Sequence, residues 1–584
     1  MSKVALLAIN AKFVHSSLAV WVLAGGIKKY AHIPHEVEVF ETTIHQENSE
    51  IVNDVVSNNP DVVGISTYIW NAKKLPELLK LLKEKLPKTV IILGGPEASN
   101  NSNYWLEHGA DYVLQGECEQ TFPFFLDTLE NIGFSGAEIL RTVETNEEVE
   151  LRKPIDPIEL DELIASIYLA KPIEETVATK ADIIIEPIDP YSDTYFEALN
   201  GRIAYIESSR GCPYQCSFCL SSGRGVDFFP LDIVKEQLLK LSRSGTKTIK
   251  FVDRTFNCNS DRACELFKYI IELDTTCCFH FEVAADLFDE YQLSILSQAP
   301  PGRIQFESGI QSYHSPALKA TSRQMNIEKT ESNILRLLDN KNIHMHIDLI
   351  AGLPYETLPD FQVGFDRAFA LKAHTLQLGF LKLLHGSVIR EQADEYHVRY
   401  NPNPPYEITS SPWLNTDELQ SLRDTENALQ HTYNKSRFLS TLQYVISISR
   451  LSPFSVFHAL GVIAPNHGTH LTVYAQEVYD CFVTLPNVID YKLRDCMVCD
   501  WLGMAKGRNL PQFLKNPDTQ HTQLIKVFSD LFGHTVARDE VAVLRSGACV
   551  AVDSSNRDPV TGLYCLKFVL TYIDSYCRIR LITI

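Results

Sequence analysis

The chain has 584 residues, of which 45% are apolar and 22% are charged, so about three domains are expected rather than one core. Its formal net charge of −20, with no run rich in lysine and arginine, argues against a surface that binds nucleic-acid phosphates. No apolar run reaches the roughly eighteen residues that a membrane span needs, so no membrane partner is expected.

The cysteine content indicates the compartment. The apolar run at 4–10 is short and strand-like, unlike the core of a signal peptide. Fourteen cysteines without an export signal therefore indicate a reducing environment, and we expect the cytoplasm. In that environment, clustered thiols more often serve metal binding or catalysis than disulfides.

The first part of the chain alternates between strand and helix patterns. Segments rich in β-branched residues predict strands at 4–10, 35–42, 61–67, 89–95 and 111–116. Helical patterns lie at 17–30, 49–59, 73–87, 101–109 and 117–133. Five such units predict a doubly wound parallel sheet, a flavodoxin-like or Rossmann-like α/β domain over residues 1–135. Residues 136–200 lose the pattern and are expected to form a linker.

A second alternating series fills residues 201–390. Its strands are predicted at 202–209, 247–253, 279–285, 303–310, 343–350 and 374–384. Six parallel strands are fewer than the eight of a closed barrel, so we expect a partial (βα)6 barrel of the TIM type, with its site at the carboxyl mouth. Residues 391–584 predict a mainly helical domain that ends in strand-like pieces at 541–552 and 563–573.

Three cysteines lie within eight residues, directly after the first strand of the second series. Cys212, Cys216 and Cys219 have the spacing C-x3-C-x2-C, and the next cysteine, Cys258, lies beyond a whole predicted helix. A structural zinc site would need a closed set of four ligands. A four-iron cluster also normally takes four thiolates, so three of them leave one iron open to a small ligand.

This loop resembles the signature of the radical S-adenosylmethionine (SAM) superfamily, CxxxCx-aromatic-C, with Phe218 as the aromatic residue. The resemblance extends from residue 202 to about 385. It implies that the three cysteines hold a [4Fe-4S] cluster whose open iron binds SAM. One electron from the cluster then cleaves SAM to a 5′-deoxyadenosyl radical, so an electron donor such as flavodoxin or ferredoxin is expected.

The resemblance also implies SAM contacts at the ends of the later strands. The residues that match are Phe218, Asp253, Arg254, Glu282, Glu307, Ser308, Gly309, Gln311, Gly352 and Pro354. The Gly-Gly-Glu turn that is typical of the family after the second strand is absent.

A doubly wound domain in front of a radical SAM barrel resembles the cobalamin-dependent branch of the superfamily. The loops after the third, fourth and fifth strands then imply cobalamin contacts by Ser66, Thr67, Trp70, Gly94, Gly95, Gly116 and Glu117. The DxHxxG motif that supplies a cobalt-ligating histidine in other cobalamin proteins is absent, and Trp70 is the candidate that caps the lower face of the cobalt. His15 in the first loop is expected to be a hydrogen-bonded loop residue.

Two other ligands for this domain fit less well. A flavin would need a phosphate loop rich in serine and threonine after the first strand, and residues 11–17 are a poor version of it. The tRNA methylthiotransferases place a cluster here with three cysteines, whereas this domain has only Cys118.

Several further cysteines and histidines invite a metal interpretation. Cys496 and Cys499 form a CxxC pair with Cys481 upstream, but their helical spacing equally serves packing. His344 and His346 alternate with apolar residues on a predicted strand, so both are expected to point into the barrel. One of them could move a substrate proton, although such residues are more often hydrogen-bonded core histidines.

The expected function is methylation of an unactivated carbon of a small molecule. In this hypothesis the deoxyadenosyl radical removes a hydrogen atom, methylcobalamin delivers the methyl group, and a second SAM regenerates methylcobalamin. The alternatives are a rearrangement, cyclisation or ring contraction with the same cofactors, and a non-catalytic sensor that carries a cluster and cobalamin.

Overall fold

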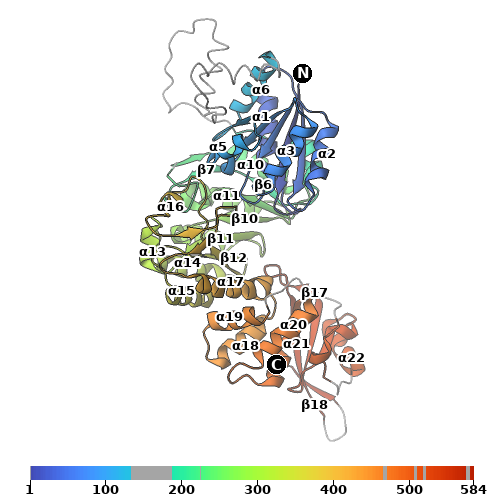
Figure 1. Ribbon diagram of the computed structural model, residues 1–584. Helices are drawn as coiled ribbons and strands as arrows, with labels where there is room; N and C mark the ends of the chain where they lie inside the picture. Colours follow the sequence, from blue (N-terminus) through green and yellow to red (C-terminus); the bar gives the residue numbers. More distant parts are fainter. Residues whose placement is uncertain are drawn as a thin grey trace. The chain divides into compact units, whose positions relative to one another are not determined.

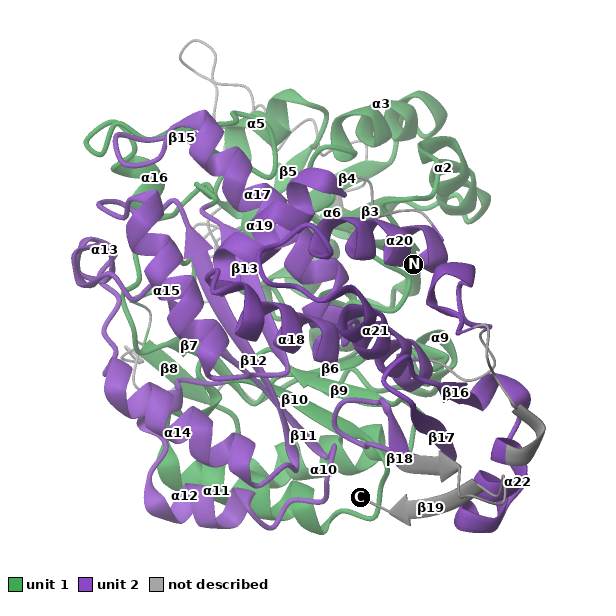
Figure 2. Ribbon diagram, turned by 90° about the horizontal axis from the view of Figure 1, so that it is seen from below, with its two compact units in different colours: residues 1–282, 382–408 green, residues 283–381, 409–584 purple. Residues whose placement is uncertain are grey.

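The computed structural model describes residues 2–132, 187–223, 225–464, 470–504, 509–516, 521–573 and 579–583. Most of the linker expected at 136–200 therefore lies outside the described residues. The chain forms two compact units (Figure 2). Unit 1 comprises Met1–Glu282 and Lys382–Ile408, and unit 2 comprises Val283–Leu381 and Thr409–Ile584.

The predicted five-stranded parallel sheet forms in unit 1 (Figure 1). Its strands are β1 (Lys3–Asn10), β2 (Glu36–Thr43), β3 (Val62–Ser66), β4 (Val90–Gly94) and β5 (Tyr112–Val113), in the order β2-β1-β3-β4-β5. Residues Val4 to Ile9 are each at most 1% exposed, because both faces of the sheet are covered. The strand order changes direction between β1 and β3, where a doubly wound sheet opens its ligand crevice.

Helices cover the two faces of this sheet. Helices α2 (Asn48–Ser57), α3 (Leu75–Lys85) and α5 (Ser102–Glu107) share one apolar core with Leu7 of β1. Helices α1 (Leu18–Tyr30) and α6 (Thr121–Ile132) contact each other and lie outside that core, on the other face (Figure 1). The short helix α4 (Pro96–Ser99) follows β4.

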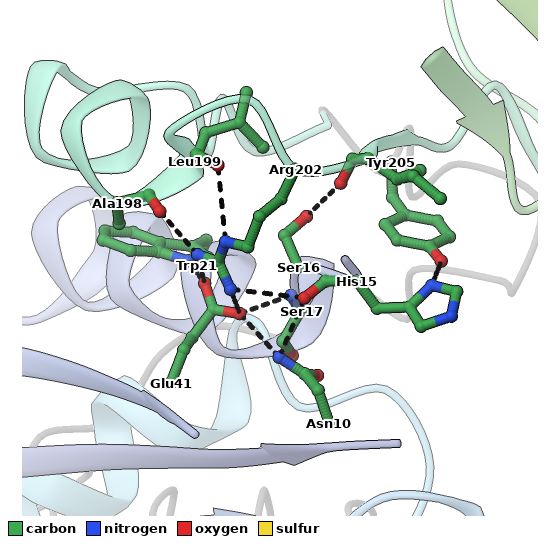
Figure 3. A network of polar contacts seen from close by, with 11 residues as sticks. Asn10, His15, Ser16, Ser17, Trp21, Glu41, Ala198, Leu199, Arg202 and Tyr205 are labelled. Atoms are coloured by element: carbon green, nitrogen blue, oxygen red, sulfur yellow. Dashed lines mark hydrogen bonds and ion pairs between the residues drawn. The ribbon is translucent and has the colours of Figure 1, made fainter. Parts of the chain in front are cut away.

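A buried ion pair joins β2 to the start of the second strand series (Figure 3). Arg202 donates to the two carboxylate oxygens of Glu41 at 3.1 and 3.2 Å, and the two side chains are 9% and 6% exposed. Glu41 also accepts hydrogen bonds from the indole of Trp21 and the backbone N–H of Ser17, both at 2.8 Å. Two charges out of water are stable only when such partners satisfy them, so this network holds the loop after β1 in place.

The six expected strands of the second series all form, three in each unit. In unit 1, β9 (Thr248–Phe251) lies between β6 (Ala204–Ile206) and β10 (Cys278–Glu282). In unit 2, β12 (Ile343–Ala351) lies between β11 (Ile304–Gln311) and β13 (Thr375–Phe380). The pairings within each unit are parallel, as predicted. The helices beside these strands are α9 (Asp193–Leu199), α10 (Leu231–Ser242), α11 (Ser260–Glu272), α12 (Glu290–Leu296), α13 (Ser315–Ala320), α14 (Ile327–Asp339) and α15 (Leu358–Ala370).

The cysteine loop connects the two strands of a hairpin that the sequence pattern did not predict. The antiparallel strands β7 (Ser209–Cys212) and β8 (Gly225–Phe228) are four residues each and lack an apolar alternation. Gly211 has φ +92°, and a Cβ there would lie 2.1 Å from the carbonyl oxygen of Gly225. Only glycine tolerates this position, so the hairpin depends on it.

The rest of unit 2 is helical and ends in an antiparallel sheet. Its helices are α17 (Thr416–His431), α18 (Leu439–Ser449), α19 (Pro453–Ile463), α20 (Leu471–Phe482), α21 (Asp490–Met504) and α22 (His521–Phe532). Its strands are β16 (Val541–Val543), β17 (Ala548–Arg557), β18 (Tyr564–Ile573) and β19 (Ile579–Thr583). Within the described ranges, no one helix has the length and apolar character of a membrane span, and only α18 and α19 counted together, with a bend of 116°, reach them.

Replacing Arg202 with alanine tests the buried ion pair. The substitution leaves the Glu41 carboxylate buried without its counter-charge, so we expect a loss of about 3–5 kcal/mol and an earlier first unfolding transition. Urea unfolding followed by circular dichroism measures this loss. Arg336→Ala removes one side of an exposed ion pair with Glu290 and should leave the transition almost unchanged. Equal effects of the two variants would contradict the structural role of Arg202.

Replacing Glu356 tests a buried carboxyl in unit 2. Glu356 is 1% exposed and accepts a 2.5 Å hydrogen bond from Ser312, and burial raises its pKa from 4.5 to about 8. The folded state therefore binds more protons than the unfolded state between these values, so stability falls as the pH rises from about 4.5 to 8. Glu356→Gln should flatten this fall in a series of urea melts. An unchanged pH dependence in the variant would contradict the assignment.

Candidate functional site

Unit 1 contains a cavity of about 740 Å³, hereafter the unit 1 cavity. Its lining includes the carboxyl ends of β1, β3 and β4 together with side chains of α1 and α6. Leu23 of α1, Phe122 of α6 and Ile92 of β4 give it an apolar part. Charged residues from the second strand series line it as well: Glu207, Arg210, Lys250, Arg254 and Glu282.

Glycines keep space open along this cavity. A Cβ on Gly64 of β3 would lie 2.9 Å from Leu6, so no larger residue fits there without movement. A Cβ on Gly94 would meet nothing closer than 3.8 Å, which leaves room for a ligand to approach the backbone. Gly95 has φ +98°, and its Cβ would lie 2.7 Å from the carbonyl oxygen of Thr67, so the turn after β4 requires glycine.

Most residues expected to contact cobalamin line this cavity. Those residues are Ser66, Trp70, Gly94, Gly95, Gly116 and Glu117. Thr67 does not line it: the residue is fully buried, and its hydroxyl finds no hydrogen-bond partner in the part of the chain that the structure describes.

Two aromatic contacts shape the loops around the cavity. The indole N–H of Trp70 donates to the carbonyl oxygen of Ile9 at 3.1 Å, and its ring stacks on Tyr68 at 4.3 Å between centroids. Trp70 stays 43% exposed, so a fixed aromatic face is offered to the cavity that it lines. His15 is hydrogen-bonded to the Tyr205 hydroxyl at 2.6 Å, as expected for a loop residue (Figure 3). Burial lowers the pKa of His15, and nearby lysines lower it further, which favours the neutral ring.

The three-cysteine loop lies in the same unit. Cys212 and Cys216 are 8% and 5% exposed, and Cys219 is half-buried, as is Phe218. The Cys212 sulfur lies 3.4 Å from the hydroxyl of Thr255. The Cys219 sulfur accepts a 3.4 Å hydrogen bond from the backbone N–H of Ser221. Sulfurs that are shielded and hydrogen-bonded in this way suit thiolate ligands of an iron–sulfur cluster.

Asp253 is hydrogen-bonded to the residues that lead into this loop. It is 1% exposed, and its carboxylate accepts hydrogen bonds from the backbone and hydroxyl of Ser208 and from the hydroxyl of Ser209, at 2.6 to 2.9 Å. Burial raises its pKa, against the effect of these hydrogen bonds. Because both oxygens bind Ser208 and Ser209, Asp253 holds the start of the hairpin in position.

Arg254 and Glu282, two other residues expected to contact SAM, line the cavity. The Arg254 side chain is 54% exposed and lies 3.8 Å from the Glu282 carboxylate, which is 28% exposed. Lys250 lies 3.9 Å from the other carboxylate oxygen. The charged groups of Arg254 and Glu282 therefore remain accessible to a polar ligand.

Arg210, which the sequence pattern did not single out, connects the two strand series. It forms a bidentate pair with Glu207 at 2.8 and 2.9 Å and pairs with Glu117 at 2.7 Å and with Glu119. Glu117 and Glu119 belong to the loop after β5, and Arg210 stands two residues before Cys212. A cation shared by three carboxylates therefore ties the cysteine hairpin to the wall of the cavity.

The remaining residues expected to contact SAM belong to unit 2. Glu307, Gly309 and Gln311 lie on the half-exposed face of β11. Ser308 is 3% exposed and lies on the opposite, buried face of β11. Gly352 and Pro354 are buried in the turn after β12, where Gly352 has φ +95°.

The other cysteines and histidines that the sequence singled out, Cys496, Cys499, His344 and His346, are absent from the lining of the unit 1 cavity. Cys496 and Cys499 lie in α21, and burial raises the pKa of their thiols to about 11 and 12. The ring of His344 stacks on that of His374 with 4.8 Å between centroids, and the Nε2 atom of His346 lies 3.1 Å from a carboxylate oxygen of Asp348.

Known families match three segments of the chain. Residues 4–126 match the B12 binding domain, 206–366 the radical SAM superfamily, and 394–533 a protein family of unknown function, DUF4080. The cobalamin-dependent radical SAM methyltransferase TokK of Streptomyces tokunonensis is 21% identical over 74% of this chain. The match spans 62% of that relative, less than two thirds of its length.

Solved structures agree with this division. The cobalamin-dependent SAM radical enzyme OxsB, solved with aqua-cobalamin, has a TM-score of 0.55 at 13% identity, covering 85% of this chain and 78% of its own. The radical SAM methyltransferase TsrM of Kitasatospora setae, solved with tryptophan and a SAM analogue, has a TM-score of 0.52 at 17% identity, covering 70% and 80%. At these identities the likeness shows the fold alone. The chain therefore contains a segment that matches the radical SAM superfamily, with a segment that matches the B12 binding domain before it and one that matches DUF4080 after it.

Proposed function

We propose that this protein is a cobalamin-dependent radical SAM methyltransferase that methylates an unactivated carbon of a small molecule. The observation that carries the proposal is the arrangement of unit 1. There the unit 1 cavity is lined by the loops of the B12 binding domain and by Arg210 and Arg254 of the radical SAM domain. Arg210 stands two residues before the first cysteine of the C-x3-C-x2-C loop.

The residues present fit the proposed cofactors. Cys212, Cys216 and Cys219 would hold a [4Fe-4S] cluster, and the cavity with its glycine-lined wall would hold cobalamin. When bound, these groups supply one-electron cleavage of SAM and a transferable methyl group. Trp70 would cover the lower face of the cobalt, because its indole is held by Ile9 and stacked on Tyr68.

The proposed SAM contacts divide into two kinds. Arg254 and Glu282 offer accessible charges for the polar groups of SAM. Gly309 on β11 and the turn at Gly352 and Pro354 would contact the ribose and adenine. Asp253 acts as a positioning residue, since it holds Ser208 and Ser209 at the start of the cysteine hairpin.

The proposal extends to the organisation and the partners of the chain. Residues 1–135 would form the cobalamin domain, 136–200 a linker, 201–390 the radical SAM barrel and 391–584 a mainly helical domain. The enzyme would work in the cytoplasm on a small-molecule substrate, with a flavodoxin or ferredoxin as electron donor.

Metal analysis and product analysis test this function. After anaerobic purification from cells supplied with cobalamin, we expect about four iron atoms and one cobalt atom per chain. Incubation with SAM and a reductant should yield 5′-deoxyadenosine, and methyl transfer should add S-adenosylhomocysteine. Deoxyadenosine without S-adenosylhomocysteine under turnover would reject methylation. Iron without cobalt would reject the cobalamin assignment.

Replacing Cys216 separates the two cofactors. Cys216→Ala removes one of three ligands, so we expect loss of most of the iron and of SAM cleavage, while cobalt per chain stays the same. The matched control is Cys565→Ala, because Cys565 is a half-buried cysteine on β18 of unit 2, outside the loop. Iron retained at the wild-type level in the Cys216 variant would show that the loop does not bind the cluster.

Replacing Trp70 tests its contact with cobalamin. Trp70→Ala removes the aromatic face, and we expect cobalamin affinity to fall by up to about tenfold, with an altered visible spectrum of the bound cobalamin. Iron content should not change. Tyr104→Ala on α5 is the control, since Tyr104 is 38% exposed and is absent from the residues that line the cavity. An unchanged affinity and spectrum in the Trp70 variant would rule out the contact.

A further inference from the structure

The two longest strands of the radical SAM domain present one polar face. Along β11 and β12, fully buried residues alternate with half-exposed ones. The half-exposed set on β12 begins with His344, His346 and Asp348, and on β11 it includes Glu307 and Gln311. Strands β11, β12 and β13 contain no lysine or arginine, so the charges that this face itself carries come from acids and imidazoles.

Three of these side chains converge. Glu307 lies opposite His346 in the register of β11 and β12, and Asp348 lies two residues further along. One ligand atom from each of these three residues lies within 4.8 Å of the other two. The Nε2 atom of His346 is 3.1 Å from a carboxylate oxygen of Asp348, and the two side chains are 14% and 18% exposed.

The space beside this cluster is shaped by a glycine and an amide. Gly309 pairs with Asp348, so no side chain stands opposite that carboxylate. The Gln311 carboxamide folds over this glycine, since its nitrogen would lie 1.9 Å from a Cβ on Gly309. The Gln311 carbonyl oxygen is buried and finds no hydrogen-bond partner among the described residues. A buried acceptor without a donor costs free energy, so a cation or a hydrogen-bond donor bound at this position would stabilise it.

Charge balance points in the same direction. Two carboxylates whose oxygens lie within 4.8 Å repel each other, and a bound divalent cation would offset both negative charges. One imidazole with two carboxylates is a ligand set that suits a divalent transition metal such as Mn²⁺, Fe²⁺ or Zn²⁺. Ligands on paired strands are also held more rigidly than ligands on loops.

We propose that Glu307, His346 and Asp348 form a divalent-cation site on the open face of β11 and β12, with the Gln311 carbonyl oxygen as a further donor. This assignment gives Glu307 a partner other than SAM. It turns His346 from a candidate for substrate proton transfer into a metal ligand. The site does not depend on the three cysteines, so it stands or fails separately from the proposed function.

Titration with Mn²⁺ tests this site. The full-length protein, purified anaerobically with its cofactors and freed of loose metal by a chelator, is titrated while the electron paramagnetic resonance signal of free Mn²⁺ is followed. We expect one bound Mn²⁺ per chain, displaced by Zn²⁺. His346→Ala and Asp348→Asn should each weaken binding by at least about tenfold. His344→Ala is the matched control, because His344 lies on the same strand and face but outside the cluster, and it should bind as the wild type does.

A cluster-free variant separates this test from that of the proposed function. Cys216→Ala should bind Mn²⁺ as the wild type does even if its iron is lost. Circular dichroism confirms that each variant is folded before titration. The inference is overturned if the wild type binds no Mn²⁺, if His346→Ala and Asp348→Asn bind as tightly as the wild type, or if Cys216→Ala abolishes binding.

Discussion

The buried ion pair between Glu41 and Arg202 is the constraint on which unit 1 depends. Glu41 belongs to the strand beside β1, and Arg202 stands just before β6, the first strand of the radical SAM domain. Although the two residues are 161 positions apart in sequence, this pair and its hydrogen bonds set where β6 begins relative to the loop after β1. His15 and Tyr205 then meet and line the cavity. This ion pair and its partners therefore help to hold the part of the cavity wall that His15 and Tyr205 form.

A second set of polar contacts fixes the position of the hairpin that carries the cysteines. Asp253 holds the two serines at which the hairpin starts, and Arg210 ties the same hairpin to the loop after β5. Neither residue needs to touch a reacting atom to matter, since a short loop with three ligands must be held in one geometry. In unit 1, the residues proposed to bind the cluster are therefore different from Asp253 and Arg210, which hold the cysteine hairpin in position.

The sequence predicts the fold well where periodicity is strong and misses what depends on long-range contacts. The strand at 61–67 follows from a continuous apolar run, because both faces of β3 are buried, whereas the strand at 343–350 follows from alternation, because one face of β12 is half-exposed. The hairpin at Gly211 was missed, since its short strands are set by one glycine and not by a pattern. The cysteine loop could be predicted, because its three cysteines lie within eight residues of one another in the sequence. In contrast, the roles of Arg210 and Asp253 depend on partners over 40 residues away, and the convergence of Glu307 with His346 depends on strand register.

The central claim is that one unit of this chain holds a cluster at the cysteine loop and cobalamin in the unit 1 cavity. Anomalous diffraction at the iron and cobalt absorption edges, from crystals grown anaerobically with cobalamin, tests it most directly. The account predicts an iron peak beside Cys212, Cys216 and Cys219 and a cobalt peak inside the cavity next to Trp70. A cobalt peak elsewhere on the chain, or an iron peak without cobalt, would contradict it.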